Sequence, residues 1–163
     1  MKLSVTLNGQ KTVLEANPDS SLLSVLRKLK LFSVKKGGEK GCSSFCTILM
    51  DGKPVPSDII PFAIIRNSNI VTLEYFAQTD AYKYIEEGFE QAGIKLCGYC
   101  NADKIFTAWS IIKTSSRPSL EEIELAISNM SFCCTNKTAY ISGIRFASAI
   151  RNKHIGNTRN VRK

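Results

Sequence analysis

The chain has 163 residues, of which 44% are hydrophobic and 22% charged, and its formal net charge is +8. This composition is typical of a globular protein and excludes an extended low-complexity chain. The sequence holds no run of ~18 apolar residues, so no membrane-spanning helix is expected.

The first half of the chain is rich in strand signals. In the opening stretch, LSVTLNGQKTVLE, two β-rich runs flank Asn8-Gly9, the favoured residue pair for a type I′ hairpin. A glycine-rich loop and two further strands follow later, in CTILMDG and in NIVTLEY (69–75). A helix is expected between the hairpin and the glycine-rich loop. Ser20 or Ser21 caps it, and its apolar face consists of Leu22, Leu23, Val25, Leu26 and Leu29. These elements predict an α+β module of the β-grasp kind over residues 1–77.

Beyond Gln78 the apolar residues recur with the 3.6-residue period of helices. Four helices are expected, and Gly93 follows the first one where a C-cap belongs. Ser119 and Glu122 form a capping box that opens the third helix. The fourth covers residues 140–151. The pattern predicts a four-helix domain over residues 78–152, followed by a basic flexible tail over 153–163.

The opening segment alternates apolar and polar residues, which indicates a strand and not a signal peptide. Six cysteines without an export signal then favour reduced thiols or metal ligands in a cytoplasmic protein. The basic residues cluster in the first third and in the tail, without the interleaved aromatic residues that stack on bases. A nucleic-acid partner is therefore disfavoured. No catalytic residue is predicted, since the single histidine, His154, lies in the polar tail.

The cysteines fall in predicted loops, as the pairs 42/46, 97/100 and 133/134. Cys97 and Cys100 lie just before a helix, whose free N–H groups and dipole stabilise thiolates. A thioredoxin-type redox pair has the same Cys-Gly-x-Cys form, but its βαβ context is absent from the predicted elements. A zinc site could combine this pair with Cys133 and Cys134, although the usual second pair is spaced.

A strand-rich half followed by a helical half with Cys-Gly-Tyr-Cys resembles the two-cluster [2Fe-2S] subunit of molybdenum hydroxylases of the xanthine dehydrogenase/aldehyde oxidase family. The resemblance runs from LNGQ to about Ala149 and includes FSVKKG, CTILMDGKPVPS, GFEQAGIKLCGYC and RPSLEEIELAI. It implies an N-terminal plant-type ferredoxin-like β-grasp domain and a C-terminal four-helix [2Fe-2S] domain.

The resemblance implies a degenerate N-terminal cluster site. In the family, ligands in the order Cys-x4-Cys-x2-Cys are followed by a fourth cysteine after an Asp-Gly turn. With the match anchored without gaps on Cys46-Thr47 and Asp51-Gly52, the four ligand positions become Gly38, Ser43, Cys46 and Asp58. One thiolate remains, so this cluster is expected to be lost.

The C-terminal site keeps more of its ligands. The family pattern of Cys-Gly-x-Cys and a later Cys-x-Cys falls on Cys97, Cys100 and Cys134, with Phe132 in the third ligand's place. Neighbouring residues of an extended segment point apart, so Cys133 can replace the missing thiolate only where the backbone bends sharply. The resemblance therefore implies at most one [2Fe-2S] cluster.

An intact member of the family passes electrons from a molybdenum centre through two clusters to FAD on a partner. The resemblance implies that this chain docks onto a large molybdopterin-binding catalytic subunit, and it leaves an FAD subunit open. Molybdopterin and FAD are expected only on partners. With the first cluster lost, the leading hypothesis is a mainly structural docking subunit. The alternatives are an electron-transfer subunit with one [2Fe-2S] cluster in the helical domain, and a free-standing basic regulatory or nucleic-acid-binding module.

Overall fold

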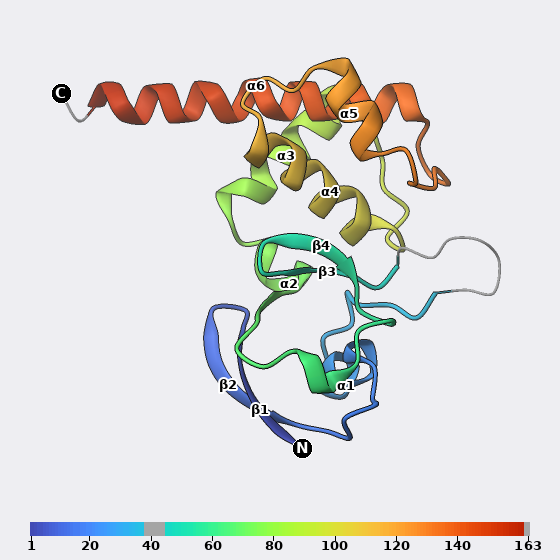
Figure 1. Cartoon of the computed structure of the whole chain (residues 1–163). Coiled ribbons are helices and arrows are strands. Elements are labelled where there is room, and N and C mark those ends of the chain that lie inside the picture. The colour runs from blue at the N-terminus through green and yellow to red at the C-terminus, as the bar shows by residue number, and fades with distance from the viewer. Residues whose placement is uncertain (38–44, 162–163) are drawn as a thin grey trace. The chain divides into compact units, whose positions relative to one another are not determined.

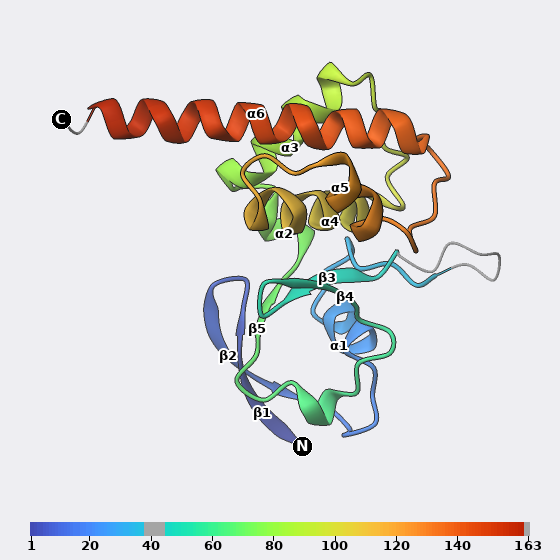
Figure 2. The same ribbon diagram turned by 45° about the horizontal axis from the view of Figure 1, so that its top comes forward.

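Figures 1 and 2 show a computed structural model of the chain, which describes residues 1–37 and 45–161, with side chains through Thr158. The chain divides into two compact units. The first consists of Met1–Gln78 and Gly98–Phe106, and the second of Thr79–Cys97 and Thr107–Lys163. The first combines a sheet with helices and the second is helical, which confirms the predicted α+β class.

Within the described residues of the first unit, five strands form the sheet, in the order β2-β1-β5-β3-β4. β1 pairs antiparallel with β2 and parallel with β5, while β3 pairs antiparallel with both β4 and β5. The strands are β1 (Lys2–Leu7), β2 (Gln10–Glu15), β3 (Thr47–Met50), β4 (Lys53–Pro56) and β5 (Asn69–Val71).

Two tight turns fix the register of the two hairpins. Asn8 and Gly9 have φ angles of 50° and 79°, and Asp51 and Gly52 have 51° and 80°. Glycine, asparagine and aspartate adopt this left-handed region at the least cost, and a type I′ turn requires it at both central positions. The predicted hairpin at Asn8-Gly9 is confirmed. The second turn leads into β4, a strand that the sequence interpretation missed.

Helix α1 (Leu22–Lys28) packs against the sheet. Its predicted cap is confirmed, because the Ser24 N–H donates to Ser21 Oγ at 3.3 Å. Leu29 was expected on the buried face but is 45% exposed. The helix ends there, since Lys30 has a φ of 62°. The core of the unit includes Leu3, Val5, Leu22, Leu26, Ile48 and Ile70.

The strand predicted over 69–75 is shorter than expected, because it ends at Val71. The side chain of Asn8 forms hydrogen bonds with Thr72, the residue after the strand. The Thr72 N–H donates to Asn8 Oδ1 at 2.8 Å, and Asn8 Nδ2 donates to Thr72 Oγ1 at 3.1 Å. Thr72 then precedes the short helix α2 (Leu73–Phe76). The side chain of Asn8 therefore occupies the Thr72 N–H, a backbone group that a longer strand would need for its ladder.

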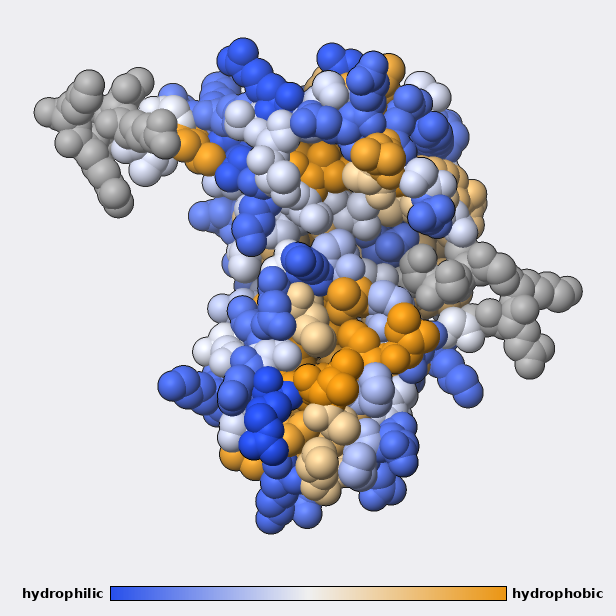
Figure 3. All heavy atoms as spheres, in the orientation of Figure 1, coloured by the Kyte–Doolittle hydropathy of each residue, from blue (hydrophilic) through white to orange (hydrophobic). Residues whose placement is uncertain are grey.

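Apolar side chains gather on the face of the first unit seen in Figure 3, over the 3-10 helix η1 (Phe62–Ile64) and the segment leading into it. Ile59 and Ile64 are 73% and 60% exposed. Large contiguous apolar surface is uncommon on a free monomer and often marks an interaction site.

The helical unit contains α3 (Asp80–Gln91), most of α4 (Asn101–Thr114), α5 (Leu120–Ala126) and α6 (Lys137–Val161). Gly93 ends α3 with a φ of 70°, as predicted. The predicted capping box is also present, with Ser119 N donating to Glu122 Oε2 at 2.7 Å and Glu122 N to Ser119 Oγ at 3.1 Å.

α6 is longer than the predicted fourth helix. It continues through Val161, ten residues beyond the predicted end at Arg151, so residues 153–161 are helical and not a loose tail. Figures 1 and 2 show α3 and α6 side by side, with the C-terminal part of α6 running on past α3. None of the helices in the described part of the chain is long and apolar enough to cross a membrane.

Candidate metal centre

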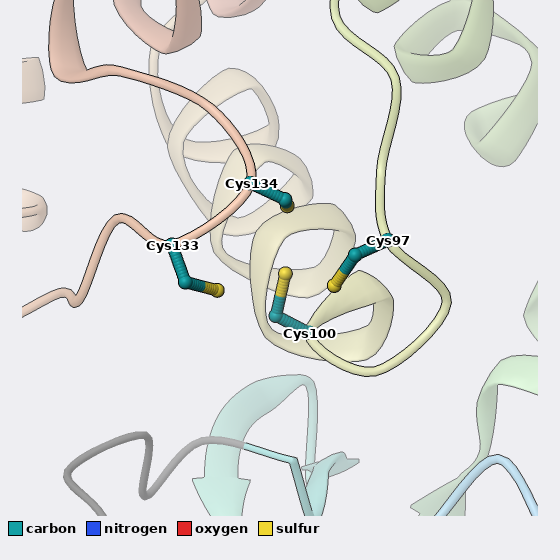
Figure 4. Close-up of side chains that lie close together, drawn as sticks. All are labelled: Cys97, Cys100, Cys133 and Cys134. Atoms are coloured by element: carbon teal, nitrogen blue, oxygen red, sulfur yellow. The ribbon is translucent and has the colours of Figure 1, made fainter.

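The four cysteines predicted as metal ligands lie together. The sulfur atoms of Cys97, Cys100, Cys133 and Cys134 all lie within 4.8 Å of one another. Figure 4 shows the four side chains pointing towards a common centre, from the turn before α4 and from the loop before α6. Cys100 is buried and Cys134 half-buried, whereas Cys97 and Cys133 are exposed.

The first pair is positioned by the turn that opens α4. Gly98 has a φ of 85°, and its N–H donates to Asn101 Oδ1 at 2.8 Å, which folds the chain between the two cysteines. Cys100 directly precedes α4, and its carbonyl accepts a hydrogen bond from the Lys104 N–H at 3.1 Å. A thiolate at this helix end is stabilised by the helix dipole.

The second pair converges because the backbone bends. The bend covers residues 133–135, shortly before α6 begins at Lys137. Phe132 anchors the loop just before the bend, since its ring packs 5.7 Å from the fully buried ring of Tyr140 on α6. The sharp bend that the sequence required for Cys133 is therefore present, and it directs both adjacent thiols to one site.

Four convergent thiols fit an iron–sulfur or a zinc centre. A [2Fe-2S] cluster takes four cysteine thiolates, and a structural zinc ion takes the same donors in a tetrahedron. The mixture of buried and exposed thiols suits either centre. The chemistry of the donor atoms alone thus allows both, and acid-labile sulfide distinguishes them.

Two of the four predicted N-terminal cluster positions, Cys46 and Asp58, contact each other. The fully buried Cys46 thiol donates to Asp58 Oδ1 at 3.2 Å, while the Ser57 hydroxyl donates to the Cys46 carbonyl at 2.7 Å. Burial is the largest cause that raises the pKa of the Cys46 thiol. A backbone hydrogen bond at Asp58 opposes it, while the hydrogen bond to the Asp58 carboxylate and the charge of that group raise the pKa further. Because the metal-binding form is the thiolate, this environment disfavours ligation by Cys46. Gly38 and Ser43 lie outside the described residues.

The sequence interpretation found the cysteines, but it missed Lys104. This residue is the only charged residue fully buried in residues 1–37 and 45–158, and its neighbour Asp103 provides an ion pair. The sequence signal for its burial was its position: Lys104 lies four residues after the candidate ligand Cys100 and is followed directly by the apolar residues Ile105 and Phe106.

Residues 72–145 match the family described as [2Fe-2S] binding domain. The chain is 31% identical over 146 residues to the nicotinate dehydrogenase small FeS subunit of Eubacterium barkeri, covering 89% of this chain and 93% of the relative. It is 32% identical over 152 residues to one of the subunits of nicotinate dehydrogenase from Pseudomonas putida, and the match covers 93% of this chain and 97% of that relative.

Solved structures agree with these relatives. The quinoline 2-oxidoreductase structure from Pseudomonas putida 86 matches with a TM-score of 0.79 and 30% identity, over 93% of this chain and 96% of that one. The aldehyde oxidoreductase of Desulfovibrio desulfuricans matches with a TM-score of 0.80 and 28% identity, over 93% of this chain and 17% of the longer one. The chain therefore belongs to the [2Fe-2S] iron–sulfur subunits of the xanthine dehydrogenase, or molybdenum hydroxylase, family.

Proposed function

We propose that the chain is the small subunit of a molybdenum hydroxylase complex and that it carries a single [2Fe-2S] cluster. Cys97, Cys100, Cys133 and Cys134 are its proposed ligands, in a C-terminal domain of the four-helix type. The observation that carries the proposal is the convergence of their four thiols within 4.8 Å. It favours the electron-transfer alternative over a subunit without any cluster.

The N-terminal β-grasp domain is proposed to have lost its cluster. A glycine at position 38 offers no side-chain ligand, and Ser43 offers a hydroxyl where a thiolate is needed. The Cys46 thiol instead donates a hydrogen bond to Asp58. With one cluster in place of two, the relay of this subunit is shorter than in an intact member of the family.

When bound, a [2Fe-2S] cluster supplies one-electron transfer. The chain's own residues prepare the site for it. The N-terminus of α4 stabilises the thiolate of Cys100, and the Phe132–Tyr140 contact holds the bend that presents Cys133 and Cys134. A cytoplasmic complex with a large molybdopterin-binding subunit, and with FAD on a further subunit, completes the proposed electron path.

Iron and acid-labile sulfide in the anaerobically purified protein test the cluster. We expect about two irons and two sulfides per chain. Cys97→Ser and Cys133→Ser should lose most of both, while the matched variant Cys46→Ser should retain them. About four irons per chain would contradict the loss of the first site. Zinc without sulfide would show that the four cysteines hold a zinc ion and not a cluster. A protein that contains no metal would support only the docking role.

Docking onto the catalytic subunit is supported by the exposed apolar surface around Ile59 and Ile64. Co-expression with the molybdopterin-binding subunit should yield a complex that survives purification. The double variant I59D/I64D should weaken it at least tenfold, because two charges replace apolar contacts. Val13→Asp on β2, at a position 64% exposed, is the matched control. A monomer that binds nucleic acid in a salt-dependent way would instead favour the regulatory alternative.

A further inference from the structure

A buried ion pair lies in the first turn of α4. The Lys104 side chain is 1% exposed, and its Nζ lies 3.6 Å from Oδ2 of Asp103, which is 13% exposed. Removing an ammonium group from water is costly, and natural proteins retain such a group mainly where it is paired. An apolar residue would fill the same space at lower cost. The charge at this position therefore points to a role beyond packing.

The position of Lys104 relative to the cysteines is fixed by the helix. Its N–H donates to the Cys100 carbonyl at 3.1 Å, the hydrogen bond of one helical turn. Residues four apart lie on the same face of a helix, so Lys104 lies one turn after Cys100 on the same side of α4. The side chain is shielded from solvent, and a charge inside the protein is screened by water and salt much less than a surface charge.

We propose that Lys104 raises the reduction potential of the cluster held by Cys97, Cys100, Cys133 and Cys134, with Asp103 opposing it in part. The inference rests on the proposed function. Reduction adds one electron, and therefore one negative charge, to a centre that four thiolates already make negative. A buried cation nearby stabilises the reduced form more than the oxidised form, and net charge around a cluster is among the factors that set its potential.

An anaerobic redox titration of the cluster-loaded protein, followed by visible absorbance and by the EPR signal of the reduced state, tests the proposal. Lys104→Met should lower the equilibrium constant for reduction about tenfold, which is a shift of about 59 mV to more negative potential for one electron. Lys104→Arg keeps the charge and should restore the potential of the unchanged protein. Asp103→Asn should shift the potential in the opposite direction.

Lys113→Met is the matched control, because Lys113 is an exposed lysine in the last turn of the same helix. It should leave the potential unchanged. An unaltered potential in Lys104→Met, with iron and sulfide as in the parent protein, would overturn this inference and leave the proposed function intact. A parent protein without a cluster would overturn the proposed function itself. If Lys104→Met does not fold, Asp103→Asn decides, and an unchanged or lowered potential in that variant overturns the inference.

Discussion

Glu74 shows how a single carboxylate can connect distant parts of the first unit. Its Oε1 accepts from the Ser33 N–H at 2.7 Å, and its Oε2 accepts from the Ser33 hydroxyl. Burial alone would raise the pKa of Glu74, but hydrogen bonds to the carboxylate, foremost those from Ser33 and then that from Thr72, together outweigh burial and lower the pKa. A pKa lowered in the folded state stabilises the protein above the unfolded value, and this contribution disappears as the pH falls through the folded value.

Ser33→Ala should therefore destabilise the protein in a pH-dependent way. At pH 7 we expect the free energy of unfolding to fall by about 1 to 2 kcal/mol, because a hydrogen bond to an ionised group is lost. As the pH falls through the lowered pKa of Glu74 in the folded state, the carboxyl group becomes protonated, and the difference between the two proteins should shrink. Urea unfolding over a series of pH values from neutral to acidic measures this. A difference that stays constant over the series would show that the charge of Glu74 has no part in it.

At the scale of elements, the approach of α3 and α6 depends on a glycine in each helix. A Cβ atom added at Gly88 would lie 2.4 Å from the backbone nitrogen of Ala147, so no side chain fits without moving a helix. A Cβ atom added at Gly143 of α6 would likewise lie 2.8 Å from Cδ1 of the Phe89 ring. Small residues on both helices thus permit the close packing on which the helical unit rests.

Gly88→Ala is expected to lower the free energy of unfolding by about 2 to 3 kcal/mol through overpacking. Gly156→Ala is the matched control on α6, because a Cβ there meets nothing within 4 Å. It should stabilise the protein by up to about 1 kcal/mol through helix propensity. Chemical denaturation of both variants gives the comparison, and equal effects would contradict the packing argument.

Local signals in the sequence predicted local structure well. The Asn8-Gly9 hairpin and the Ser119 capping box depend only on residues within a few positions of one another, and both are present. The end of β5 depends on hydrogen bonds between Asn8 and Thr72, which are 64 residues apart in the chain. The convergence of Cys133 and Cys134 likewise depends on tertiary packing, since the Phe132–Tyr140 contact anchors the bend. The sequence singled out the four cysteines that lie together, but it could not predict their geometry.

For the molecule as a whole, Trp109 provides a built-in reporter of the folding of the helical unit. It is the single tryptophan of the chain, it lies on α4, and the Arg151 guanidinium of α6 stands 5.7 Å from the centre of its ring. Arg151 also donates to the Ile112 carbonyl at 2.8 Å, which connects α6 to α4. The fluorescence of Trp109 therefore follows the unfolding of the helical unit.

Removal of iron should shift the unfolding of the Trp109 signal to lower urea concentration. Metal bound only by the folded state stabilises it by mass action, by about 2 to 3 kcal/mol at ~100 times the dissociation constant. Cys97→Ser purified without treatment should resemble the chelator-treated parent protein. If iron removal leaves the midpoint unchanged, binding is not linked to the folding of this unit.

The exposure of Cys97 and Cys133 would also determine how the proposed centre withstands air. Exposed thiolates are the ones that oxygen and peroxide attack first, and sulfenic acid formed on either sulfur would remove a ligand. An isolated chain would then lose its cluster during aerobic handling, whereas a partner that covers these two residues would protect it. Oxidative lability of the proposed cluster in the free subunit would thus follow directly from presenting two of its four sulfur atoms to solvent.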